Sequence, residues 1–232
     1  MNYLSHFVFN HRVCGLPVEP YFVTGVALPD LWLRFSRQRR IRWRVVRDAE
    51  PASENAERLR TGLLNHADAD QSFHVLPAFI GWQRDVQDAV DADGIHPAMV
   101  DFLAHVAVEL ALDHHLLLRE PGLADDFYDL IAAADADCVE REMAALAGVD
   151  TRGLAAVLRG FVQRRFIRQY RTHQGLCEVV HIILMLATFP PPPARIIQRL
   201  IAEAICRTEP LRVWESLSLR TRTAAAAPII GA

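Results

Sequence analysis

The chain has 232 residues, of which 51% are hydrophobic, and its formal net charge is −3. This length and composition suit one globular domain with a substantial core. A nearly neutral chain without a recognised binding module argues against a nucleic-acid-binding function. The four cysteines are scattered, with no Cys-x-x-Cys pair, so the sequence predicts neither a disulfide framework nor a zinc knuckle.

No targeting or membrane-spanning segment is expected. The N-terminus lacks the charged segment and apolar run that are typical of a signal peptide. The longest apolar run, Val179–Phe189, is interrupted by His181 and followed by four prolines, so it is too short to span a bilayer. The sequence therefore predicts a cytoplasmic protein without a membrane span.

The N-terminal part of the chain favours a short helix over residues 1–13, followed by a loop from Gly15 to Pro20. Asp30 follows an apolar stretch and Pro29, which is typical of a helix cap or of a ligand presented from a helix end. Seven arginines then fall between residues 34 and 47. We expect this segment to be either a solvated loop or helix, or a docking patch for an anionic ligand or an acidic protein.

From residue 51 onward the chain reads as helices separated by short breaks. Pro51-Ala52-Ser53-Glu54 is typical of a helix start, Pro77 predicts a break, and Pro97 lies near the first position of a later helix. The expected helices span residues 54–73 with a continuation to 90, and 98–119, 123–147, 151–171, 175–189, 194–208 and 212–219.

No alternation of polar and apolar residues with turn signals occurs along the chain, so the expected fold class is all-α. Residues 1–220 are expected to form a single domain, and residues 221–232 a flexible tail.

Two of the expected helices carry histidines and acids four residues apart. Residues at this spacing lie about 40° apart around a helix and therefore share one face. They are His66, Asp70 and His74 on the first helix, and His105, Glu109, Asp113 and the adjacent His114 on the second. The two stripes are typical of the two walls of a metal site.

Imidazole and carboxylate ligands together suit Mn, Fe or Zn. Three residues at this spacing span about 12 Å of helix, so one ion cannot easily take all three. Either two ions lie along the groove, or one ion takes ligands from both helices. Two ions about 3.5–4 Å apart would polarise a phosphoryl oxygen and activate a water molecule. Alternatively, such pairs are ordinary helix-surface interactions, and the protein is a non-catalytic helical protein with a structural or sensory metal site or a buried polar network.

A set of short motifs occurs in the same order as in a known family. They are Met1-Asn2-Tyr3-Leu4-Ser5-His6, Gly25 with Asp30, Gly62 with His66-x3-Asp70, Glu109-x3-Asp113-His114-His115-Leu116, and Arg165–Arg171 with Gly175-Leu176. Over residues 1–186 the chain thereby resembles the acyl carrier protein phosphodiesterases, which are all-helical and related to the HD-domain phosphohydrolases. The resemblance implies an HD-like helical bundle and a metal-dependent, in the family Mn-dependent, hydrolase that releases 4′-phosphopantetheine from a serine of an acidic carrier protein.

The resemblance implies that Asp30, His66, Asp70 and the pair Asp113–His114 are metal ligands or catalytic groups. This chain departs from the family pattern at three positions. His74 stands where the family has an acid, Glu109 stands where it has an aspartate, and His105 has no counterpart in the pattern. The additional imidazole shifts the expected preference toward Zn, Fe or Co.

A second group is also similar. The pattern formed by His6, Asp30, the His66–His74 stripe and His105-x3-Glu109 is similar to the zinc-dependent phospholipase C and S1/P1 nuclease group. Those phosphoesterases are secreted and begin from a processed N-terminus, which this sequence does not suggest.

The resulting hypothesis is a metal-dependent phosphodiesterase acting on an acidic carrier protein or a small phosphodiester. The expected ligands of one or two ions are Asp30, His66, Asp70, His74, His105, Glu109 and Asp113. The histidines expected to orient the water or protonate the leaving oxygen are His74, His105 and His114. The arginines expected to bind the substrate phosphate or to dock the carrier are Arg34, Arg37, Arg39 and Arg40.

Overall fold

A computed structural model describes residues 1–36, 38–90 and 95–208. All regular elements in these ranges are helices, so the all-α prediction is confirmed, and they pack into one compact domain. The expected helix at 212–219, the expected tail at 221–232 and Arg37 lie outside the described residues.

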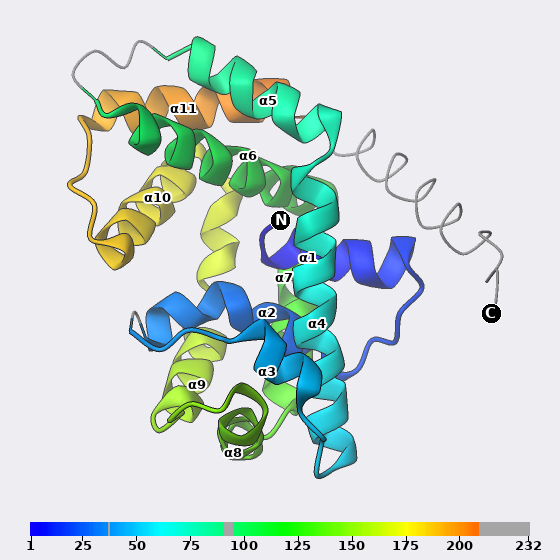
Figure 1. The fold of residues 1–232 in the computed structure, drawn as a ribbon. Helices are drawn as coiled ribbons and strands as arrows, with labels where there is room; N and C mark the ends of the chain where they lie inside the picture. Colours follow the sequence, from blue (N-terminus) through cyan, green and yellow to red (C-terminus); the bar gives the residue numbers. More distant parts are fainter. Residues whose placement is uncertain (37, 91–94, 209–232) are drawn as a thin grey trace, which may run out of the picture.

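The elements run in the following order along the chain. They are α1 (Tyr3–Val8), the π-helix η1 (Phe9–Val13), α2 (Pro20–Phe35), α3 (Trp43–Asp48), α4 (Glu54–His74), α5 (Pro77–Asp88), α6 (Pro97–Arg119), α7 (Leu123–Ala133), α8 (Ala136–Ala147), α9 (Leu154–Arg164), the 3-10 helix η2 (Phe166–Arg171), α10 (His173–Ala187) and α11 (Ala194–Arg207). Helices α5, α6, α10 and α11 gather at one end of the molecule and α8 and α9 at the other, and α4 extends between them (Figure 1).

Several helix ends form where the local sequence predicts them. The Ser53 hydroxyl caps α4 by accepting a hydrogen bond from the Ala56 amide at 3.0 Å. Pro77 and Pro97 are the first residues of α5 and α6, where the missing N–H of proline costs no hydrogen bond. Gly148 ends α8 in the left-handed conformation, with φ of 62°.

The structure differs from the expectations in three places. Helix α2 continues past Pro29 to Phe35, so Asp30 lies inside the helix and not at its end. The expected helix 123–147 is two helices, because Asp135 accepts hydrogen bonds from the amides at 137 and 138 and begins α8. The expected helix 151–171 ends at Arg165, whose φ of 44° is left-handed, and η2 follows.

Helices α2 and α4 approach each other closely at two glycines. A Cβ atom on Gly62 would lie 2.3 Å from the Phe22 carbonyl oxygen and 3.0 Å from the Gly25 Cα atom, and one on Gly25 would lie 2.4 Å from the Leu59 carbonyl oxygen. Figure 1 shows α2 running up against the side of α4. Because both positions are glycine, backbone meets backbone and side chains from the two helices can reach one site.

None of the helices within the described ranges is both long enough and apolar enough to cross a bilayer.

Candidate metal centre

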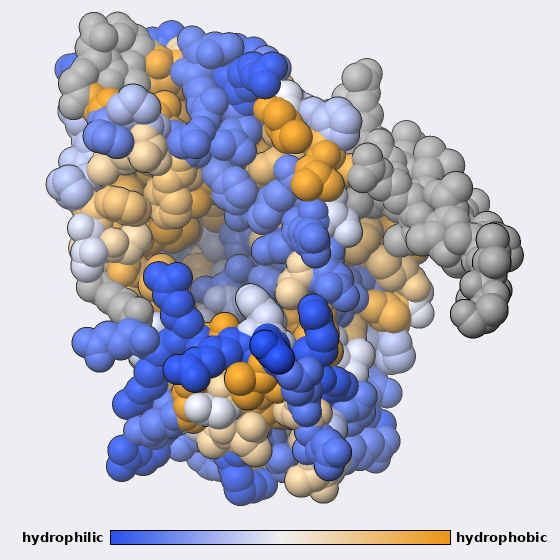
Figure 2. Space-filling view, in the orientation of Figure 1, coloured by the Kyte–Doolittle hydropathy of each residue, from blue (hydrophilic) through white to orange (hydrophobic). Residues whose placement is uncertain are grey.

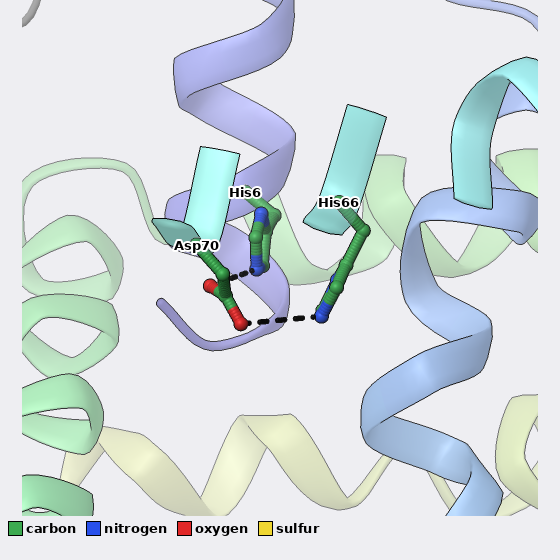
Figure 3. Close-up of side chains that lie close together, drawn as sticks. All are labelled: His6, His66 and Asp70. Carbon is green, nitrogen blue, oxygen red and sulfur yellow. Dashed lines mark ion pairs between the residues drawn. The ribbon is translucent and has the colours of Figure 1, made fainter. Parts of the chain in front are cut away.

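The first cluster joins α1 to α4 and consists of His6, His66 and Asp70. His6 Nε2 lies 3.0 Å from Asp70 Oδ1, and His66 Nε2 lies 3.4 Å from Asp70 Oδ2. The two imidazole rings stack with their centroids 4.1 Å apart, and Figure 3 shows a nitrogen of each directed toward the carboxylate. One potential ligand atom from each residue therefore lies within 4.8 Å of the other two. We call this cluster the first triad.

The second triad joins α4 to α6 and consists of His74, His105 and Glu109. Glu109 Oε1 lies 2.9 Å from His74 Nε2 and 3.3 Å from His105 Nε2. All three side chains are partly exposed. The expected stripe on α4 is therefore divided, with its first two residues in one triad and His74 in the other.

The Met1 ammonium group lies between the two triads. Its nitrogen is 2.7 Å from Asp70 Oδ1 and 2.8 Å from Glu109 Oε1, and it is 3.4 Å from His74 Nε2. Burial acts to lower the pKa of this ammonium group, but Glu109 and Asp70 outweigh burial and raise the pKa to about 10. A cation is therefore strongly stabilised at the position between the two carboxylates.

Asp30 reaches the first triad from α2. Its Oδ1 atom lies 3.9 Å from His66 Nε2, and its Oδ2 atom is buried with no hydrogen-bond partner among the described residues. Burial raises the pKa of Asp30 to about 7, against the opposing effect of His66. A buried carboxylate oxygen without a partner is costly, and a bound cation would satisfy it.

The positions of the two histidines in the first triad suit metal ligands. His66 Nδ1 donates a hydrogen bond to the Val26 carbonyl at 2.9 Å, which directs Nε2 toward Asp30 and Asp70. His6 Nε2 faces Asp70 Oδ1 at 3.0 Å, and His6 Nδ1 is buried with no hydrogen-bond partner among the described residues. Burial and the neighbouring His66 lower the pKa of His6 to about 3, so its ring is neutral at ordinary pH. The residues present therefore fit a divalent ion.

The structure places Asp113 and His114 outside both triads. The Asp113 carboxylate accepts hydrogen bonds from the Leu4 amide at 3.1 Å and from the Ser5 amide and hydroxyl at 2.7 and 2.6 Å. His114 Nδ1 donates to the Tyr170 carbonyl at 2.7 Å. Asp113 thus anchors the N-terminal end of α1 to α6, and His114 joins α6 to η2.

Replacing Asp113 by alanine should mainly destabilise the fold. Two amides and a hydroxyl would lose a buried charged acceptor, and we expect a loss of about 3–5 kcal/mol in the free energy of unfolding. Urea unfolding would measure it, with Asp101→Ala at the exposed start of the same helix as the control. Unchanged stability combined with lost ion binding would place Asp113 among the ligands instead.

The arginines expected to bind phosphate have different surroundings. Arg34 lines a cavity of about 150 Å³ together with Asp30 and Glu109, and its guanidinium lies 4.4 Å from the centre of the Phe166 ring. It has no carboxylate partner within the described ranges. Arg39 is instead paired with Asp150 at 3.2 Å. Arg40 is exposed and lines none of the cavities found around the triads.

A later group of arginines is also engaged. Arg165 and Arg168 each pair with Asp125 on α7, at 2.9 and 2.6 Å. These pairs connect η2 and its preceding residue to α7. Of the arginines considered, Arg34 is therefore the one that combines a partly buried position, a free charge and proximity to the triads.

The cavity beside the triads lies between α2, α6 and α10. Its apolar wall comes from α6 and α10 and includes Val106, Leu110, Val179, Ile183 and Leu186. Figure 2 shows a hollow on this face with a largely hydrophobic wall on the α6 and α10 side and strongly hydrophilic side chains along the opposite rim. A second cavity of about 350 Å³ beside α9 shares Arg34, Phe166 and Leu186 with the first.

His6 was not among the expected ligands, although it completes the first triad. It lies 60 residues before His66, so no helical spacing connects the two. The available signal was its place at the end of the Met1–His6 motif.

The sequence matches no protein-family model and no curated protein, and the fold matches no solved structure. The function is therefore inferred from the residues of the site.

Proposed function

We propose that the protein is a metal-dependent phosphodiester hydrolase, with a divalent ion or a pair of ions held between α1, α4 and α6. The observation that carries this proposal is the arrangement of two histidine–carboxylate triads on either side of a buried cation position, beside a cavity that holds an unpaired arginine. Such a site combines ligands for a metal with a counter-charge for a phosphate.

In this proposal His6, His66 and Asp70 hold one ion, with Asp30 completing the set, and His74, His105 and Glu109 hold a second. Four of these seven side chains are imidazoles, which favours Zn or Fe over Mn. A divalent ion in the site would polarise a phosphoryl oxygen and make a water molecule more acidic.

The chain's own groups supply the remaining functions. Arg34 binds a non-bridging phosphate oxygen, because its guanidinium faces the cavity and the Phe166 ring holds it there. The apolar wall from α6 and α10 excludes water from the leaving group.

The ordered motifs suggest a more specific substrate within this proposal. An HD-like phosphohydrolase of the acyl carrier protein phosphodiesterase type would act on the phosphopantetheine arm of an acidic carrier protein. Exposed arginines such as Arg40 and Arg42 lie just after α2 and suit an acidic partner. A nuclease-like or phospholipase-like substrate would use the same ligands, and His6 belongs to the motif patterns of both resemblances.

A second function is favoured by one observation. The Met1 ammonium group already pairs with both Asp70 and Glu109, so the triads could form a buried polar network, or a structural metal site, without catalysis. Measurements of bound ion and of phosphodiester turnover distinguish the hydrolase from a non-catalytic network or structural metal site.

The test uses full-length protein stripped with a chelator and reloaded with Mn, Fe or Zn. We expect stoichiometric ion binding and ion-dependent hydrolysis of bis(p-nitrophenyl) phosphate. His66→Ala should lower turnover by more than about 100-fold. The exposed His11→Ala is the matched control and should retain activity. A folded protein that binds no ion and hydrolyses no phosphodiester would refute the proposal.

A further inference from the structure

Tyr3 is the one tyrosine of this cavity whose hydroxyl has no hydrogen-bond partner in the described part of the chain. It lies in the first turn of α1, three residues before His6, and lines the cavity with Asp30 and Arg34. Only 5% of its surface is exposed. By contrast, the Tyr170 hydroxyl, which lines the same cavity, accepts a hydrogen bond from Asn2 Nδ2 at 3.4 Å.

The Tyr3 ring is held by a cage of aromatic side chains. Its centroid lies 5.2 Å from that of Phe161, 6.0 Å from that of Phe166 and 6.1 Å from that of Phe127. Phe166 also lies beneath the Arg34 guanidinium. One aromatic cluster therefore positions both a hydroxyl group and a guanidinium group at the same cavity, and neither has a polar partner.

An unpartnered hydroxyl and an unpartnered guanidinium beside metal ligands suit the two kinds of oxygen on a phosphodiester. We infer that Tyr3 is the catalytic acid of the proposed hydrolase and that its hydroxyl donates a proton to the oxygen of the departing alcohol, while Arg34 holds a non-bridging oxygen. This inference rests on the proposed function and extends it by naming the group that protonates the leaving oxygen.

The step balances with water as the only co-reactant. The oxygen of water forms a bond to phosphorus, and the bond between phosphorus and the leaving oxygen breaks. That oxygen takes the Tyr3 hydroxyl proton and departs as an alcohol. The attacking water releases one proton to solvent, and the tyrosinate regains one proton from solvent. The products are a phosphomonoester and an alcohol, with no change in oxidation state.

The electrostatic surroundings keep Tyr3 protonated until the step occurs. Burial, followed by the negative charge of Asp30, raises the pKa of the Tyr3 hydroxyl well above its ordinary value. The group is consequently a donor at any working pH. An alkoxide is more basic than this tyrosinate and therefore takes the proton, whereas p-nitrophenolate is a stable anion.

The experiment compares two phosphodiesters that differ in the basicity of the leaving group. Tyr3→Phe removes the hydroxyl and keeps the ring within its aromatic cage. We expect it to lower kcat/KM for diethyl phosphate, whose leaving group is an alkoxide, by about 100-fold or more, and for bis(p-nitrophenyl) phosphate by at least tenfold less. Tyr170→Phe is the matched control, because it removes a hydroxyl from the same cavity, and should affect both substrates equally.

Several outcomes would overturn the inference. An equal loss on both substrates would make Tyr3 a structural residue, and unchanged activity on both would remove it from the reaction. A selective loss in Tyr170→Phe but not in Tyr3→Phe would assign the proton to Tyr170. If ion-loaded wild-type protein hydrolyses neither substrate, the proposed function fails as well, and wild-type turnover thus distinguishes the two failures.

Discussion

Gly62→Ala is expected to unfold or strongly destabilise the protein. The added Cβ atom would lie 2.3 Å from the Phe22 carbonyl oxygen and 2.9 Å from the Val26 amide nitrogen. Both are backbone atoms of α2, so no side-chain rotation can relieve the contact and the helices must separate. Overpacking of this kind costs about 3 kcal/mol or more. For a chain of this size we expect the melting temperature to fall by about 6–12 °C.

The same substitution should also impair ion binding. Asp30 is carried by α2 and His66 by α4, and the close approach at Gly25 and Gly62 brings their side chains to 3.9 Å. Calorimetric titration with Zn at a temperature where the variant remains folded would measure the loss of affinity.

The control for this prediction is Gly81→Ala in the middle of α5, where an added Cβ atom meets no atom within 4 Å. Alanine there should stabilise the helix by up to about 1 kcal/mol. Equal stability of Gly62→Ala and wild-type protein would contradict the close packing of α2 on α4.

Asp70→Asn is expected to abolish turnover while the protein remains folded. Asp70 contacts three groups at once, with His6 at 3.0 Å, His66 at 3.4 Å and the Met1 ammonium nitrogen at 2.7 Å. Asparagine keeps the shape but removes the charge that an ion needs. We expect the ion of the first triad to be lost and turnover of bis(p-nitrophenyl) phosphate to fall by about 1,000-fold or more.

Without metal, the difference in unfolding free energy between wild type and Asp70→Asn should depend on pH. Burial acts to raise the pKa of Asp70, but the hydrogen bonds from His6 and His66 and the ammonium charge outweigh it and hold the pKa well below the usual value of 3.8. A depressed carboxyl pKa stabilises the fold above the unfolded-state pKa, and the benefit is lost as pH falls through the folded-state pKa. The difference between wild type and variant should therefore be largest at neutral pH and shrink below about pH 4.

Asp68→Asn, on the exposed side of α4, is the control for both measurements. Wild-type ion content and turnover in Asp70→Asn would show that the first triad is not the catalytic ion site.

Much of the α4 and α6 part of the site could be predicted from spacing. His66 and Asp70, and His105 and Glu109, lie one turn apart on their helices and meet as expected. The spacing along a helix does not, however, distinguish a metal ligand from a residue that binds backbone amides. Asp113 lies one turn beyond Glu109 on α6. Its carboxylate contacts the Leu4 and Ser5 amides of α1 and not the residues of the two triads.

The remaining parts of the site depend on contacts between segments far apart in the chain. His6 reaches Asp70 from α1, which Asp113 anchors to α6. Arg34 lines the cavity and has no acid beside it among the described residues, whereas Arg39 pairs with Asp150. The helix break at Asp135 is not predicted, because the surrounding alanines and aspartates are typical of a continuous helix. The break forms because the Asp135 side chain accepts hydrogen bonds from the amides of Asp137 and Cys138.

The anchoring of α1 by Asp113 has a kinetic consequence. With six residues, α1 is too short to be helical alone, so it forms when Leu4 and Ser5 reach a carboxylate about 108 residues away along the chain. We expect contacts of such long range to form late in folding, because the intervening loop must close first. We therefore expect the complete set of proposed metal ligands to form only after the folding barrier has been crossed. An ion held by them should slow unfolding several-fold and leave the refolding rate nearly unchanged.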